Sequence, residues 1–304
     1  MSIKKILISG GTGFIGKYFI MYYLNIYKET TFFVLTRKPN KQLSSSNQII
    51  FVSSLDKVPD CDVVINLAGK SIGTYPWTKK NKEKILNSRL NITKNIVNYI
   101  NQTKVKPKVF ISASAVGYYN LFNDDNITIN ENTEVSNINT FSNTLCNLWE
   151  EEAKKVLTNN SNIKLCIVRF GVVLGKNGGF LSKIILPIKL YIFFLFGKGK
   201  NYMPWVHIED VSRAIDFIIQ QPLHTTYNIV APSFNTQKEI ASCVANFLKR
   251  KIFFYMPSFF VKILFGQMGK ELFLSNQKIE PLNLLKQNFK FKYDNIKDAI
   301  KSII

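Results

Sequence analysis

The stretch ILISGGTGFIGKYF, residues 6–19, places four glycines within seven residues, between an apolar run and an amphipathic one. A glycine-rich loop that follows a strand and opens a helix is the arrangement that holds the pyrophosphate of a dinucleotide. There, Gly10 permits the tight turn, Gly13 lets the backbone approach the phosphates, and Gly16 allows close packing of helix on sheet. The spacing is G-x-x-G-x-x-G rather than the commoner G-x-G-x-x-G, so a plain tight turn is the alternative. We expect cofactor contacts from Gly10, Thr12, Gly13, Phe14, Ile15 and Gly16.

Apolar runs of strand length alternate with helical patterns in the first part of the chain. The strand-like runs are 4–9, 31–36, 62–67, 107–112 and 163–169, and the helical patterns are 15–27, 78–100 and 143–157. Near-continuous apolar runs are typical of a parallel sheet buried on both faces, and the alternation indicates βαβ units. The sequence therefore predicts an α/β fold with a doubly wound parallel Rossmann sheet.

The pattern becomes irregular after residue 170. We interpret 1–172 as an NADP-binding Rossmann domain and 173–304 as a smaller α/β substrate lobe with a C-terminal module. A short strand near 227–230 is expected to rejoin the sheet, and helices are expected around 236–249 and 257–274.

The end of the second strand indicates which cofactor the loop holds. NAD-binding chains usually carry an acid there for the adenosine ribose, whereas this chain reads Leu-Thr-Arg-Lys over 35–38. The Arg37 guanidinium would hold a 2′-phosphate by two hydrogen bonds, although Arg37 and Lys38 also fit plain surface charges. We therefore expect NADP rather than NAD. Further cofactor contacts are expected from Thr36, Leu67, Ala68, Gly69 and Ser112.

Several motifs occur in the order found in one large enzyme superfamily. They are TGFIG at 12–16, NLAG at 66–69, ISASAVGYY at 111–119 and RFGVVLG at 169–175. With them the chain resembles the extended short-chain dehydrogenase/reductase superfamily. It is most similar to the epimerase-like YfcH-type branch, on the evidence of Trp77-Thr78, Lys84, Ser88-Arg89, PWVHIED at 204–210 and the module at 256–291. The resemblance covers nearly the whole chain and implies a nucleotide-sugar epimerase or an NADP-dependent oxidoreductase acting on a small molecule.

The resemblance also shows where the catalytic residues of the superfamily should stand. Active members use a Tyr-x-x-x-Lys pair on a helix, with a serine that orients the substrate oxygen. Ser114 matches the serine position. In the helix TFSNTLCNLWEEEA, 140–153, Ser142 stands where the tyrosine belongs and Cys146 where the lysine belongs. The usual acid–base pair is therefore missing.

Three interpretations of the missing pair remain open. A different group does the proton transfer, with Tyr118 or Tyr119 the first candidate and His207 the next, because a histidine titrates near neutrality. Each of these residues also fits a structural role. Alternatively, the chain binds NADP(H) without turnover and reports its redox state to a partner, or the whole site is a relic.

Two arginines have a place in the expected site. Arg89 would face the cleft and meet an anionic substrate group, although a solvated charge on a helix face is an equal alternative. Arg169 lies in an apolar strand, where its burial requires a partner. Lys70 stands where this branch often carries an acid, which weakens any inherited substrate assignment.

The composition narrows the possible partners and the compartment. The chain has 304 residues and a net charge of +20, but the basic residues form no stripe and Lys and Asn are abundant even in loops. We therefore expect no nucleic-acid partner. The four cysteines form no CxxC pair, which argues against a metal site and a disulfide framework and favours a cytoplasmic protein.

Neither a signal peptide nor a transmembrane segment is expected. The first strand begins by Ile3, and the apolar stretch at 184–196 is interrupted by Pro187 and Lys189 and is too short to span a bilayer. That stretch would be buried, face a partner or lie on a membrane surface. A homodimer through the helices at 78–100 and 143–157 is expected by analogy with the superfamily.

Overall fold

Seven parallel strands form the central sheet of the computed structural model, which describes residues 3–37, 47–119, 121–122, 124–135, 139–176, 178–252 and 254–304. The strand order is β3-β2-β1-β4-β5-β7-β12. The strands are β1 (Lys5–Ser9), β2 (Thr31–Leu35), β3 (Ile49–Val52), β4 (Val63–Asn66), β5 (Val109–Ala115), β7 (Lys164–Phe170) and β12 (Thr225–Ile229). The predicted doubly wound Rossmann fold is confirmed.

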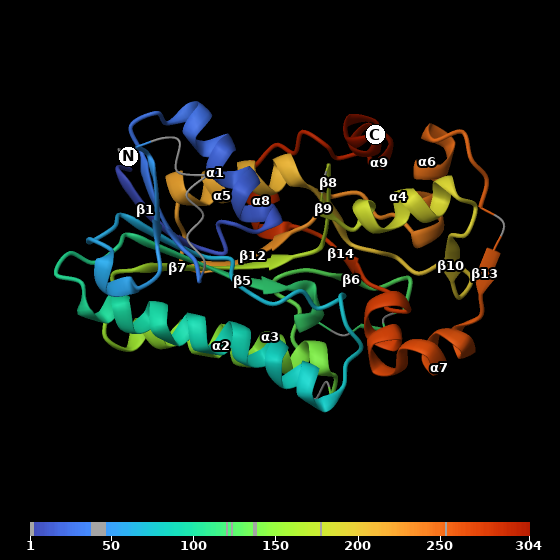
Figure 1. Ribbon diagram of the computed structural model, residues 1–304, viewed down its shortest axis with the longest axis horizontal. Coiled ribbons are helices and arrows are strands. Elements are labelled where there is room, and N and C mark those ends of the chain that lie inside the picture. Colours follow the sequence, from blue (N-terminus) through green and yellow to red (C-terminus); the bar gives the residue numbers. More distant parts are fainter. Residues whose placement is uncertain are drawn as a thin grey trace.

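Helices cover both faces of the sheet (Figure 1). On one face lie α1 (Phe14–Ile26) and α5 (Ile208–Gln220), which bury apolar side chains such as Phe19, Tyr23 and Ile215. On the other lie α2 (Lys79–Gln102) and α3 (Phe141–Lys154), which bury Ile96 and Ala153. Apolar side chains on both faces explain why the strands are nearly continuous apolar runs.

Two elements of this core were missing from the sequence prediction. The edge strand β3 has only four residues, and it lies just after the undescribed stretch 38–46. Helix α5 was overlooked, although Ile208, Val211, Ile215 and Ile218 recur at helical spacing behind two acids in its first turn.

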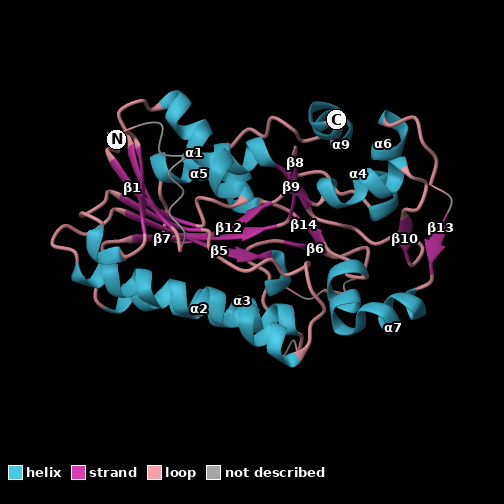
Figure 2. Ribbon diagram, viewed as in Figure 1, coloured by secondary structure: helices cyan, strands magenta, loops and turns pink. Residues whose placement is uncertain are grey.

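The remaining elements build the other half of the molecule (Figure 2). Its small strands are β6 (Thr128–Ile129), β8 (Val172–Gly175), β9 (Gly178–Gly179), β10 (Phe194–Phe196), β11 (Trp205–His207), β13 (Phe254–Met256) and β14 (Lys278–Ile279). Its helices are α4 (Leu181–Lys189), α6 (Gln237–Phe247), α7 (Ser258–Met268) and α9 (Ile296–Ile303), whereas the short α8 (Leu282–Lys286) packs against β12 and places Leu284 in the sheet core. A separate apolar core, with Leu174, Leu181, Trp205, Ile240 and Ile300 among its members, holds much of this half together.

The apolar stretch 184–196 is only half buried. Ile184 and Ile188 of α4 point into the core, whereas Leu186, Leu190 and Ile192 are exposed. Within the described part of the chain, every helix is too short or too polar to cross a bilayer.

Candidate functional site

The glycine loop lies at the point where the strand order reverses. β1 and β4 are neighbours at the centre of the sheet, and the chain leaves their carboxyl ends toward opposite sides. Open α/β sheets bind their ligands in the crevice at such a switch point. The loop after β1 and residues 67–69 after β4 therefore form the two walls of the candidate site.

Two of the loop glycines are required by close packing. Gly10 has a φ of +74°, and a Cβ there would lie 2.6 Å from the carbonyl carbon of Leu67. A Cβ at Gly16 would lie 2.4 Å from the Gly10 oxygen. Thr12 and Gly13 are exposed at the tip, where the Gly13 N–H closes the turn onto the Gly10 oxygen at 2.9 Å. The loop is thus a tight cradle whose open side meets solvent.

The start of α1 is open to an anion. Its N-cap is Gly13, which supplies no side-chain cap, and its first turn reads Phe-Ile-Gly-Lys and contains no acid. The Lys17 N–H donates to the Gly13 carbonyl at 3.0 Å, so the N–H groups ahead of it in that turn are the ones available to phosphate oxygens. Ile15 is half-buried against the sheet core.

The ring of Phe14 packs closely against three glycines at the β8–β9 turn. A Cβ at Gly178 would lie 2.2 Å from its Cδ2 atom, and Gly175 and Gly179 also approach the ring. Any cofactor contact at this position is therefore left to the backbone. The sequence analysis did not assign these three glycines to the site. Their close spacing around the β8–β9 turn was the signal that could have identified them.

Hydrogen bonds hold the carboxyl ends of the central strands in register. Ser9 donates to Asn66 at 2.6 Å, and Asn66 donates to Thr93 of α2 at 2.8 Å. The Trp149 indole also donates to Thr93, at 3.1 Å. The Ser112 hydroxyl on the neighbouring strand is buried and has no hydrogen-bond partner among the described residues. An unsatisfied buried hydroxyl at this edge fits a polar group of a bound cofactor.

Thr36 and Arg37 follow β2 as expected. The Thr36 N–H donates to Val52 at 2.9 Å, which fixes the exit of the strand, and Arg37 is exposed beyond it. Lys38, the second basic residue of the prediction, lies outside the described residues.

Arg89 lies against the loop that follows β4. A Cβ at Gly69 would come within 3.0 Å of its guanidinium carbon, and the guanidinium stacks over Trp149 at 5.0 Å. Its Nη1 donates to Lys70 and Ile85 carbonyls at 3.1 and 3.0 Å, and its buried Nε has no partner among the described residues. No described carboxylate pairs with it, and burial lowers its pKa. This is a cation suited to an anionic ligand.

Ser114, Tyr119 and Tyr118 meet around Arg169. Arg169 is buried and therefore needs an opposite charge, which Glu150 of α3 supplies. The two carboxylate oxygens of Glu150 accept hydrogen bonds from Arg169 Nε and Nη2, both at 2.8 Å. Ser114 donates to the same carboxylate at 2.6 Å. Glu150 thus holds the proton of the serine hydroxyl and leaves the Ser114 oxygen only as an acceptor.

The two tyrosines differ in what they can do. Tyr119 is fully buried, accepts from Arg169 at 2.8 Å and donates to Asn228 at 2.9 Å, and burial raises its pKa to about 12. Tyr118 is half-buried under the Arg169 guanidinium, which lies 3.4 Å from its ring centroid. Its hydroxyl makes no hydrogen bond to the residues that the structure describes. Tyr118 is therefore the tyrosine available to a ligand.

The side chains of Ser142 and Cys146 are both held by contacts with other protein groups. Ser142 donates to Glu271 at 2.7 Å, and the same carboxylate accepts the backbone N–H groups of Phe141 and Ser142 at 3.1 and 2.9 Å. Cys146 contacts the Ala115 carbonyl at 3.6 Å, and burial raises the pKa of its thiol to about 11. Neither residue can replace the tyrosine or lysine of the usual pair.

His207 lies apart from this cluster. Its Nδ1 accepts the Glu209 N–H at the start of α5, its Nε2 lies 3.2 Å from the Ser302 hydroxyl, and its ring packs 3.9 Å from that of Tyr293. These contacts make it a helix cap joined to the C-terminal segment. Among the described residues, no three His, Cys, Asp or Glu side chains gather as metal ligands.

The comparisons with known proteins agree with this geometry. Residues 6–230 match the model of the NAD dependent epimerase/dehydratase family. The chain belongs to this family. Residues 256–303 match a domain of unknown function, DUF1731, as the predicted C-terminal module requires.

Relatives of this epimerase-family chain match along its full length. The epimerase family protein SSP1921 of Staphylococcus saprophyticus is 32% identical over 99% of this chain and 100% of its own. The crystal structure of the human epimerase family protein SDR39U1 with NADPH is 28% identical, with a TM-score of 0.86 and 98% of each chain covered. A nucleoside-diphosphate sugar epimerase from Corynebacterium glutamicum, 23% identical with a TM-score of 0.76 over 98% of this chain and 57% of its own, shares the fold.

Three residues that contact the candidate site residues were not predicted from the sequence. Glu150 was visible in the sequence as an acid on the buried face of an amphipathic helix. Asn228 and Glu271 carried no such signal, because they reach the site from β12 and from the turn after α7. Their roles depend on contacts between residues more than 100 positions apart in the chain.

Proposed function

We propose that this epimerase-family chain binds NADP(H) at the switch point and acts as an oxidoreductase or epimerase-like enzyme on a small molecule. The observation that carries the proposal is the glycine cradle, in which Gly10 and Gly16 admit no side chain. The human relative whose crystal structure contains NADPH supports the choice of cofactor. Residues 1–172, completed by α5 and β12, would hold the cofactor, and the other elements of 173–304 would cover the substrate.

Each part of the cofactor would find a contact among the described residues. The N–H groups at the start of α1 would bind the pyrophosphate, and Arg37 would bind the 2′-phosphate. Leu67, Ala68 and Gly69 would line the adenine-side ribose, and the unpartnered Ser112 hydroxyl would meet a polar group. When bound, the nicotinamide would supply or accept a hydride.

Tyr118 is the residue we assign to proton transfer. It is the half-exposed member of the Arg169 cluster with a hydroxyl free to face a substrate, and it would donate a proton to the substrate oxygen during reduction. Ser114, whose proton goes to Glu150, would accept a hydrogen bond from a substrate hydroxyl. Arg89 would bind an anionic group of that substrate.

A second candidate function is NADP(H) sensing without turnover. The burial of Ser142 by Glu271 and of Cys146 in the core favours it, because the positions of the usual acid–base pair are converted to structural use. A cytoplasmic location, suggested by four cysteines without a disulfide, fits either function. A homodimer through the outer faces of α2 and α3 also fits both.

Titration with NADPH and NADH, followed by nicotinamide fluorescence, tests the cofactor assignment. We expect NADPH to bind at least tenfold more tightly, and Arg37→Ala to remove this preference because the 2′-phosphate loses its cation. Lys28→Ala, an exposed cation at the opposite end of β2, should bind like the wild type. Absence of binding to both nucleotides would refute the proposal.

A hydride-exchange assay separates the two functions. Protein loaded with NADPH deuterated at C4 is incubated with carbonyl compounds, which can accept the hydride. Protein loaded with the oxidised cofactor is incubated with sugar nucleotides deuterated at their ring carbons, which can only give one up. Loss of deuterium that Tyr118→Phe slows supports an enzyme with Tyr118 as proton donor. Tight NADPH binding with no exchange across the panel supports the sensor.

A further inference from the structure

Helix α7 exposes an apolar face that the described part of the chain leaves uncovered. Val261 and Met268 are buried on its inner side, whereas Phe259, Phe260, Ile263 and Leu264 on its outer side are between 52% and 66% exposed. A helix that is apolar on all sides normally lies in a core or against a membrane. Exposed patches of this kind mark interaction surfaces.

The apolar surface continues onto the neighbouring ribbon. The exposed rings of Phe194 in β10 and Phe254 in β13 lie 5.3 Å apart. On the same face of the ribbon, Phe196 packs against Phe265 and Phe273, with ring centroids 6.2 and 4.6 Å away, so that face borders α7. We call this surface, with the exposed turn 190–192 after α4, the apolar end.

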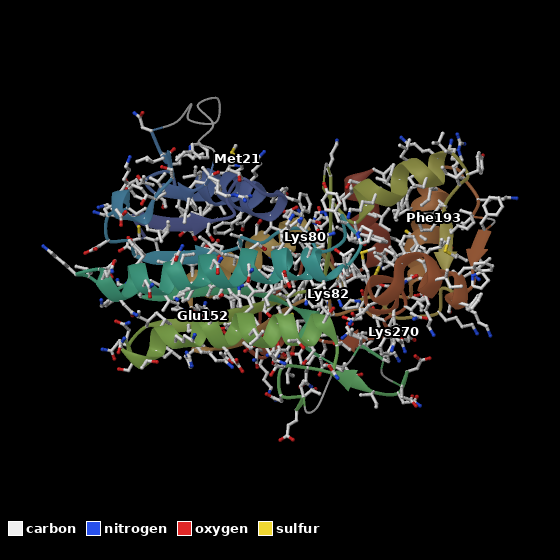
Figure 3. All side chains as sticks on the ribbon, turned by 60° about the horizontal axis from the view of Figure 1, so that its bottom comes forward. Met21, Lys80, Lys82, Glu152, Phe193 and Lys270 are labelled. Carbon is white, nitrogen blue, oxygen red and sulfur yellow. The ribbon has the colours of Figure 1, made fainter. Side chains whose placement is uncertain are left out.

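The apolar end lies at one tip of the molecule. Figure 1 shows the end of α4, β10, β13 and α7 together at the end of the long axis remote from the N-terminus. Figure 3 places Phe193 and Lys270 in the same region. The four elements come from two separate segments of the chain, 181–204 and 240–270.

Both segments are basic and contain no acid. Residues 181–204 carry four lysines, and 240–270 carry five lysines or arginines. Lys262 projects from the outer part of α7, and Arg250 lies 5.2 Å from the ring centroid of Tyr191. The nearest acids along the chain to the second segment are Glu239, exposed beside Lys238, and Glu271, whose carboxylate accepts hydrogen bonds from the start of α3, so the tip carries an excess of positive charge.

A basic groove adjoins the apolar end. It has a volume of about 280 Å³ and is bordered by Lys238, Arg250 and Lys251, with the polar side chains of Ser242 and Asn246 and the ring of Tyr255. No carboxylate lines it among the residues that the structure describes. Such a groove suits the phosphate of a lipid head group.

We propose that the apolar end docks onto the surface of an anionic lipid bilayer. Helix α7 would lie in the interface with Phe260 and Leu264 inserted, while the basic groove binds head-group phosphates. Apolar insertion combined with Lys and Arg is the combination that gives peripheral binding to anionic membranes. A second copy of the chain is a poorer occupant, because it would bring the same positive charge to the contact.

Vesicle flotation tests this proposal. We expect the wild-type chain to float with vesicles that contain phosphatidylglycerol, to bind phosphatidylcholine vesicles at least tenfold less, and to lose binding as salt rises. Phe260→Glu with Leu264→Glu should lower binding at least tenfold, whereas Val105→Glu, which changes a similarly exposed apolar residue outside the apolar end, should not. Arg250→Glu with Lys251→Glu should lower binding more than Lys104→Glu with Lys108→Glu.

The failing outcomes are distinct. No flotation with anionic vesicles at low salt, or equal binding to both vesicle types, overturns the proposal. Sedimentation velocity on the same variants tests whether a second copy of the chain occupies the surface instead. If the wild type does not float but forms an oligomer, and Phe260→Glu with Leu264→Glu dissociates that oligomer, the apolar end is a contact between protein chains. Thermal unfolding of each variant confirms that it is folded, so weak binding reports on the surface.

Discussion

At Arg169, a buried charge near the carboxyl end of β7 is held by one carboxylate and one phenol. Glu150 takes two of its hydrogen bonds and Tyr119 takes a third, and the Ser114 proton goes to the same carboxylate. Glu150 and the Tyr119 contact raise the pKa of Arg169, so the guanidinium stays charged despite its burial. One acid therefore determines both the stability of this region and the hydrogen-bonding role of the serine.

Glu150→Gln tests that dependence. Removing one charge of a buried pair leaves the other uncompensated, so we expect the free energy of unfolding to fall by about 3 kcal/mol. Glu151→Gln, an exposed neighbour on the same helix, should change it by less than about 0.5 kcal/mol. Urea unfolding measures both. Equal effects of the two substitutions would mean that the buried pair contributes nothing.

Gly10→Ala tests the cradle. Its φ of +74° and the 2.6 Å approach of a Cβ to Leu67 both oppose a side chain. We expect the free energy of unfolding to fall by about 1–2 kcal/mol, together with at least a tenfold loss in NADPH affinity. Gly73→Ala is the control, since its Cβ would meet nothing closer than Lys183 Nζ at 3.5 Å. An unchanged NADPH affinity in Gly10→Ala would place the cofactor elsewhere.

At the scale of elements, the first turn of α3 depends on the segment that follows α7. Two N–H groups and one hydroxyl of that turn donate to Glu271, and Gln267 also donates to this carboxylate, at 2.6 Å. An acid at a helix N-terminus satisfies unpaired donors and favours the helix dipole. The C-terminal module thereby supports the helix that normally carries the catalytic pair.

Hydrogen exchange on Glu271→Gln measures this support. The neutral amide places a donor where only acceptors fit, so we expect faster exchange over residues 141–146 and unchanged exchange in α1. Glu280→Gln changes another acid of the same module, one that accepts from Asn130 instead, and should leave α3 protected. Unchanged protection of α3 in Glu271→Gln would show that the helix start is stable without its cap.

At the scale of the whole molecule, the end of the chain returns to the Rossmann half. Asp210 at the start of α5 is fully buried and accepts the N–H groups of Lys292 and Tyr293, both at 2.8 Å. His207 sits beside it, between the start of α5 and Ser302 of α9. These contacts fasten the last helix to the sheet domain across the boundary between the two halves.

Acid should loosen this junction. Burial lowers the pKa of His207 against the opposing effect of Asp210 and Glu209, and Lys292 adds to the lowering. The unfolded chain, with an ordinary histidine pKa of about 6.5, then takes up the proton first as pH falls. The free energy of unfolding should therefore decrease through that pH and level off below the folded pKa.

His207→Asn isolates this contribution, because asparagine keeps a helix cap but does not titrate. We expect the variant to lose less stability than the wild type between about pH 7.5 and 5.5. His224→Asn, the other and exposed histidine, should follow the wild type. Identical pH dependence in His207→Asn and wild type would show that the junction does not respond to this residue.

The sheet, the glycine loop and the family were all accessible from the sequence. Strand-length apolar runs, helical spacing and the glycines at 10–16 are local signals, and each depends on backbone sterics or on burial of one face. The elements that the sequence analysis missed were short, such as β3, or lay after residue 170, where no regular pattern was recognised, such as α5. Of the predicted site residues, Ser114, Tyr118 and Tyr119 lie together around Arg169, whereas His207 contacts the start of α5 and Ser302; their roles in catalysis stay predictions.

What the sequence determined by itself is the doubly wound sheet, the position of the cradle, and the absence of a tyrosine and a lysine from their usual places. Only the tertiary structure decided that Glu150 holds the Ser114 proton, that Glu271 occupies Ser142, and that α7 faces outward uncovered. The reason is physical: local patterns specify which face of an element is buried. The partner of a buried polar group, by contrast, is chosen by whichever distant segment packs against it.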